Sequence, residues 1–211
     1  MNYRQFYDEM NAFPVFSIRE IEKHFPGFDS RRLVEWQKKG YIQKLRNRYY
    51  YFAGNSVNEQ YLFFAANKLY SPSYVSLESA LSWHGFIPEN TFQITSCSSR
   101  KTQSFETPLG SFKYRSIKSA LFFGYQLVEW NNHHFAIAEP EKTVIDYLYL
   151  HHEIDDPDDF ESLRWNSTEM NNSLSMKRID TYASYIGSKA LLTRLNILKE
   201  YLNATPAQNT T

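Results

Sequence analysis

Features that define several common protein classes are scarce or missing in this chain. Its 211 residues include one cysteine, Cys97, which excludes a disulfide framework and a cysteine-rich zinc site. No segment approaches the roughly 20 apolar residues that a membrane-spanning helix needs. The first residues, MNYRQFYDEMNAF, contain no apolar run of the signal-peptide kind. We therefore expect a cytoplasmic protein that does not enter the membrane.

Sequence motifs for catalysis and cofactor binding are also missing. The chain has no G-x-S-x-G elbow, no phosphate-binding loop and no dinucleotide fingerprint. The doublets His133-His134 and His151-His152 are poor chelators, because neighbouring side chains diverge on a strand and on a helix alike. We therefore expect no catalytic residue, no cofactor and no metal site.

Three carboxylates near residue 140 invite a metal-binding interpretation, but helix formation explains them better. Glu139 and Glu141 surround Pro140, which is favoured in a first helical turn, and acids there interact well with the helix dipole. Asp146 follows Lys142 by four residues, the spacing of an ion pair on one helix face. Lys142 could equally pair with Glu141.

Charge is distributed unevenly although Lys and Arg balance Asp and Glu at 23 each. Residues 1–60 carry a net charge of +3, and residues 61–211 carry −3. A second extreme lies at 139–161, where nine acids accompany one lysine. This segregation favours different partners for the two parts of the chain.

The positive charge is concentrated in residues 29–52, DSRRLVEWQKKGYIQKLRNRYYYF, which hold seven basic and two acidic residues. A helix is predicted from Asp29 or Ser30, either of which could cap it, to about Lys39. Projected at about 100° per residue, the apolar face consists of Leu33, Val34 and Gln37, with Trp36 at its edge. Arg31, Arg32, Glu35, Lys38 and Lys39 occupy the opposite face.

The elements around this helix complete a recognisable arrangement. Helices are predicted over 3–12 and from Ser17, which forms a capping box with Glu20. After Gly40, a hairpin is predicted, with Asn47 adopting positive φ at its turn. This order is that of a winged helix-turn-helix, which binds double-stranded DNA. The candidate DNA-binding residues are Arg31, Arg32, Lys38, Lys39, Lys44, Arg46 and Arg48. A solvated basic face remains the alternative.

The remaining sequence predicts a mixed α+β domain with a mainly antiparallel sheet and terminal helices. Helices are expected over 58–70, from a capping Ser76 to Trp83, within 139–152, and near 175–186 and 188–203. Strands are expected between them, with a hairpin turn at Asn131-Asn132. The predicted domains are 1–57 and 58–203, followed by a disordered tail at 204–211. Five basic residues could form a second positive patch or merely a solvated sheet face: Arg100, Lys101, Lys113, Arg115 and Lys118.

Three blocks carry a family resemblance that covers residues 5 to 160. They are the N-terminal pattern from EIEKHFPG to RNRYYYF, the block PSYVSLESALSWHGFIPE (72–89), and the block AEPEKTVIDYLYL (138–150). Together they resemble the AbiEi-type antitoxins of type IV toxin–antitoxin systems, which act in abortive infection. The resemblance implies an autorepressor that binds promoter DNA through its winged helix and counters a nucleotidyltransferase-like toxin, directly or functionally, through its C-terminal domain.

Two other functions remain open at the level of the sequence. The chain could be an enzyme that acts on the toxin through charged residues of its second domain. It could also be a plain winged-helix transcription factor without a toxin partner. The absence of a catalytic constellation favours a protein that is not an enzyme.

Overall fold

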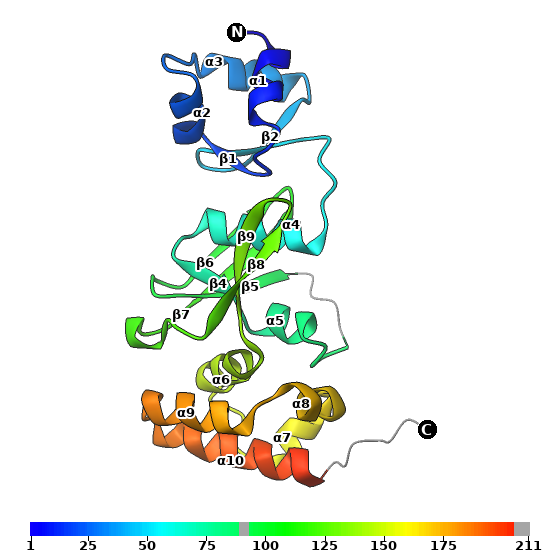
Figure 1. Cartoon of the computed structure of the whole chain (residues 1–211), viewed down its shortest axis with the longest axis vertical. Helices are drawn as coiled ribbons and strands as arrows, with labels where there is room; N and C mark the ends of the chain where they lie inside the picture. Colours follow the sequence, from blue (N-terminus) through cyan, green and yellow to red (C-terminus); the bar gives the residue numbers. More distant parts are fainter. Residues whose placement is uncertain (89–92, 205–211) are drawn as a thin grey trace.

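The computed structural model describes residues 1–88 and 93–204 and shows an elongated molecule built in three tiers (Figure 1). A small N-terminal unit (residues 1–57) lies at one end, a six-stranded sheet in the middle, and a helical tier at the other end; we call residues 58–204 the second unit. The mixed α+β class is confirmed. The predicted tail falls outside the described residues, except for Ala204 at the end of a helix. No described helix has the length and apolar character needed to cross a membrane.

The N-terminal unit contains the predicted helix, helix and hairpin in that order. Ser17 and Glu20 form the expected capping box, so the side-chain prediction at this helix start is confirmed. The three strands pair antiparallel in the order β1-β3-β2. The elements are α1 (Tyr3–Met10), β1 (Phe16–Ser17), α2 (Ile18–His24), α3 (Arg31–Lys38), β2 (Ile42–Arg46) and β3 (Tyr49–Phe52).

Local details of α3 and of the hairpin differ from the prediction. Val34 is 54% exposed, whereas Leu33 and Trp36 are buried, because a short helix meets its core through an i, i+3 pair. Ser30 occupies the cap position without a side-chain bond; the Asp29 carboxylate instead accepts the Arg31 N–H at 3.0 Å. At the hairpin turn Arg48, not Asn47, has positive φ (67°).

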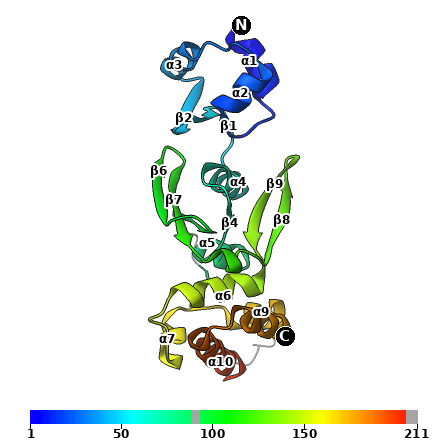
Figure 2. The same cartoon turned by 90° about the vertical axis from the view of Figure 1, so that its left-hand side faces the viewer.

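The second unit is organised around a mixed sheet with strand order β6-β7-β5-β4-β9-β8. Its strands pair antiparallel within β6–β7, β4–β5 and β8–β9, and parallel within β5–β7 and β4–β9. Helix α4 lies between the two splayed hairpins (Figure 2). The elements are α4 (Glu59–Leu69), β4 (Ser73–Val75), α5 (Glu78–Trp83), β5 (Gln93–Ser98), β6 (Gln103–Thr107), β7 (Gly110–Ser116), η1 (Ser119–Leu121), β8 (Tyr125–Trp130) and β9 (His133–Ala138).

One turn and one strand of this unit show which features local sequence can predict. Asn131 and Asn132 both have positive φ, 47° and 60°, so the predicted hairpin turn between β8 and β9 is confirmed. Strand β4 was not predicted, because three residues are too short for an alternating pattern. It nevertheless lies at the centre of the sheet, where its neighbours supply the pairing.

The helical tier closes the molecule below the sheet. Helix α6 packs between the sheet and the last helices (Figure 1), and α9 and α10 lie where the sequence predicts helices. Their apolar side chains form a core separate from that of the sheet and α4. The elements are α6 (Pro140–Leu150), α7 (Pro157–Ser162), α8 (Ser167–Ser173), α9 (Met176–Ile186) and α10 (Lys189–Ala204).

Candidate nucleic-acid interface

Helix α3 presents a basic face at the end of the molecule away from the helical tier. Leu33 and Trp36 anchor the opposite face in the N-terminal core. Of the basic residues, Arg31 contacts the Asp29 carboxylate at 2.9 Å, and its side chain is 90% exposed. Lys39 donates to Glu35 at 2.6 Å, one helical turn earlier. Ion pairs exposed to this extent are weak, so both cations can exchange their carboxylate for a phosphate.

Two further cations of α3 are not engaged in such pairs. Neither Arg32 nor Lys38 forms an ion pair within the parts of the chain that the structure describes. Lys38 is exposed and Arg32 is half-buried beside the anchored face. The structure thus brings four predicted residues together at one short helix, three of them within α3 and Lys39 directly after its last residue.

The three cations of the hairpin differ in exposure and in their contacts. Lys44 and Arg48 are exposed, but Arg46 is half-buried, and its guanidinium carbon lies 3.2 Å from the centroid of the Phe105 ring in β6. Leu45 and Tyr51 are buried in the same cluster as the core of the second unit. One side of the hairpin therefore packs on the second unit, and Arg46, a predicted DNA-binding residue, lies on that side, apart from the exposed Lys44 and Arg48.

Further contacts join the two units at this junction. The Tyr61 hydroxyl donates to the Pro14 carbonyl at 2.6 Å, and a ring nitrogen of His133 lies 2.7 Å from the Ala12 carbonyl. These residues are far apart in the chain, so no local sequence pattern indicates that they touch. The sequence analysis did not predict these contacts.

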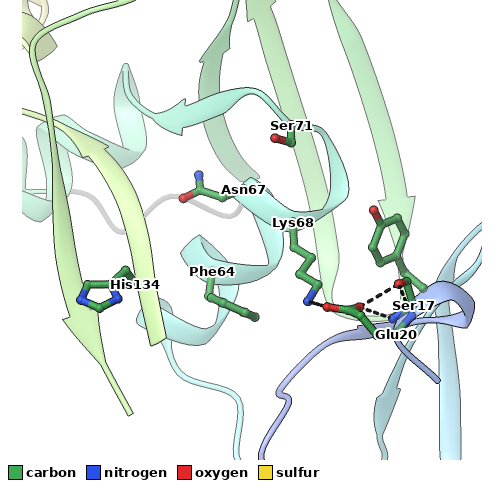
Figure 3. A pocket seen from close by; sticks show the side chains of 8 residues that line it. Ser17, Glu20, Phe64, Asn67, Lys68, Ser71 and His134 are labelled. Atoms are coloured by element: carbon green, nitrogen blue, oxygen red, sulfur yellow. Dashed lines mark hydrogen bonds and ion pairs between the residues drawn. The ribbon is translucent and has the colours of Figure 1, made fainter. Parts of the chain in front are cut away.

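A cavity of about 370 Å³ opens at the same junction, shown in Figure 3. Lys68 reaches across from α4 to the Glu20 carboxylate at 2.5 Å, and the other Glu20 oxygen accepts from Ser17. One carboxylate thus caps α2 and joins it to the second unit. The cavity is lined by Ser17, Glu20, Tyr49, Phe64, Asn67, Lys68, Ser71 and His134.

This carboxylate gives the junction a pH dependence. Burial acts to raise the pKa of Glu20, but hydrogen bonds from Lys68 and Ser17 outweigh it and hold that pKa below its usual value. A lowered folded-state pKa means that the stabilisation is complete above the ordinary value of about 4.3 and is lost as pH falls through the folded pKa.

We predict that Glu20→Gln destabilises the protein by at most about 1 kcal/mol at pH 7, because glutamine retains the cap but not the charge. The difference from the parent protein should shrink as pH falls below about 4. Urea unfolding at several pH values measures it, with Glu22→Gln on the exposed side of α2 as the control. A difference in unfolding free energy that stays constant across pH would contradict a stabilising role of the Glu20 charge.

The Asp146 carboxylate belongs to a buried network of polar side chains. Lys142 forms an ion pair with Asp146, and the two side chains are 0% and 3% exposed. The Tyr74 and Ser76 hydroxyls donate to the second Asp146 oxygen at 2.8 and 2.9 Å. Burial and the Asp146 charge hold the pKa of the Cys97 thiol well above its usual range, so the thiol stays protonated.

The network settles several sequence predictions. Of the two partners that the sequence left open for Lys142, the structure shows Asp146. Ser76 is not a helix cap: Leu77 takes that position, with φ at 58°, because the Ser76 hydroxyl is directed to Asp146 instead. Glu141 is also buried and accepts the Ser175 N–H at 2.9 Å. With its lysine fully buried, the network is a structural element of the second unit.

Arg100 of the predicted basic patch and part of the acidic stretch make local contacts. Arg100 stacks on Tyr70, 4.4 Å from the ring centroid, and donates to the Ser71 carbonyl at 3.1 Å. In the acidic stretch, Asp156 and Asp159 form the capping box of α7. Asp155 donates its N–H to the Asp159 carboxylate at 2.9 Å. These acids therefore organise a helix start.

Of the predicted site residues, Arg31, Lys38 and Lys39 are exposed and Arg32 is half-buried, while Lys44 and Arg48 are exposed on the adjoining hairpin. Comparison with known proteins adds no assignment of its own: no protein-family model matches the chain, and no curated protein matches it.

Proposed function

We propose that the N-terminal unit is a winged helix-turn-helix that reads promoter DNA with α3. Its element order, helix-strand-helix-helix-strand-strand, and its β1-β3-β2 sheet are compatible with that architecture. In such proteins the second helix of the pair enters the major groove and neighbouring elements contact phosphates. The observation that carries the proposal is that Arg32 and Lys38 of α3 form no direct ion pair among the described residues.

We further propose that the whole chain is a cytoplasmic antitoxin and autorepressor of the type IV class, with no catalytic role of its own. The support is the resemblance of the blocks at 72–89 and 138–150 to AbiEi-type antitoxins. In the structure these blocks contribute Tyr74, Ser76 and Asp146 to one buried network. The two blocks therefore form a single structural centre, and the second unit would counter a nucleotidyltransferase-like toxin.

Growth rescue tests the antitoxin role. The full chain should restore growth to cells that express a nucleotidyltransferase-like toxin encoded beside it. The variant Arg32→Ala/Lys38→Ala should rescue equally well and should fail to repress a promoter reporter, since α3 is assigned to DNA alone. Repression without rescue by the parent chain would instead identify a plain transcription factor.

A further inference from the structure

The junction contains a cation–π contact that concerns DNA binding directly. Arg46 extends from the end of β2, and its guanidinium carbon lies 3.2 Å from the centroid of the Phe105 ring. Phe105 is 5% exposed and belongs to the core of the second unit. Contacts of this kind are strongest where the cation is partly desolvated, as the half-buried Arg46 is.

The contact directs one hairpin cation away from its neighbours. Lys44 and Arg48 of the same hairpin are exposed, whereas Arg46 is held over β6, with Leu45 buried beside it. Figure 2 shows β2 between α3 and β6. Lys44 and Arg48 form no ion pair among the described residues and are thus available to a duplex, while Arg46 is committed to the second unit.

We propose that the second unit restrains DNA binding by sequestering Arg46 on Phe105, so that releasing this contact gives the hairpin one more phosphate contact. This inference rests on the proposed DNA-binding function. Under this proposal the position of the β6–β7 hairpin regulates the affinity for DNA, because displacing Phe105 from Arg46 strengthens the attraction to DNA.

The test measures the binding of a random-sequence duplex over a range of KCl concentrations by fluorescence anisotropy. Each phosphate contact adds about 0.9 to the slope of log affinity against log salt. Phe105→Leu, which keeps an apolar side chain and removes the ring, should steepen the slope by about 0.9 and tighten binding roughly 5- to 10-fold at 0.1 M salt. Arg46→Gln should leave the parent slope unchanged, and the double variant should behave like Arg46→Gln.

Arg48→Gln is the matched control from the same turn and should make the slope shallower by about 0.9. Two results would overturn the proposal. A shallower slope in Arg46→Gln would show that Arg46 already contacts a phosphate in the parent protein. An unchanged slope in Phe105→Leu would show that Phe105 does not restrain Arg46.

A measurement without DNA separates this inference from the proposed function. An arginine-modifying dicarbonyl, followed by mass spectrometry, should label Arg48 faster than Arg46 in the parent protein and label both alike in Phe105→Leu. Equal labelling in the parent protein would refute the sequestration. If the labelling is as expected but the parent protein binds no duplex, the DNA-binding function fails and the restraint proposed for it fails as well, while the Arg46–Phe105 contact stands.

Discussion

Replacing Arg32 and Lys38 together with alanine is expected to weaken promoter binding by roughly 2–4 kcal/mol. A good side-chain contact to a base is worth about 1–3 kcal/mol, and these two cations have no ion pair among the described residues. A gel-shift titration on the chain's own promoter region measures the loss. The melting temperature should stay close to that of the parent protein, since α3 is anchored through Leu33 and Trp36.

The same experiment distinguishes reading of bases from attraction to phosphate. Loss of a base contact should reduce the preference for promoter over random DNA, whereas loss of a phosphate contact should weaken both equally. Lys177→Ala on α9, which is exposed, serves as the control for a lost surface charge. Unchanged binding in the double variant would remove α3 from the DNA interface.

Asp146→Asn is expected to produce the largest loss of stability, about 3–5 kcal/mol, because breaking a buried ion pair leaves an uncompensated charge. That charge is Lys142, whose side chain is fully buried. Antitoxin activity and folding should fail together, which chemical denaturation and growth rescue would measure side by side. Asp158→Asn on the exposed surface of α7 is the matched control and should change neither.

A companion variant tests whether the pair acts through its charges. Lys142→Met with Asp146→Leu removes both charges and should recover part of the lost stability, although Tyr74 and Ser76 then lose their acceptor. An Asp146→Asn protein that melts normally but no longer rescues growth would assign the carboxylate a direct role in function.

The predictions from sequence succeeded where neighbouring residues decide the outcome. Ser17 and Glu20 lie three residues apart and form a capping box in the structure. Asn131 and Asn132 tolerate the backbone angles of a tight turn. Lys142 and Asp146 are one helical turn apart, and the sequence named Asp146 as one of two possible partners of Lys142. The buried positions Ile21, Leu33 and Leu148 follow from helical periodicity in the same way.

Tertiary structure decided the features that depend on residues far apart in the chain. Strand β4 exists because β5 and β9 pair with it, and Leu45 is buried by the second unit as well as by its own hairpin. The basic composition of residues 29–52 is determined by sequence alone, and it groups Arg46 with the six other cations. Only the fold places Phe105, 59 positions later in the chain, against the Arg46 guanidinium. Since a cation's availability depends on what packs against it, the sequence locates the charge and the packing decides which of these cations a partner can reach.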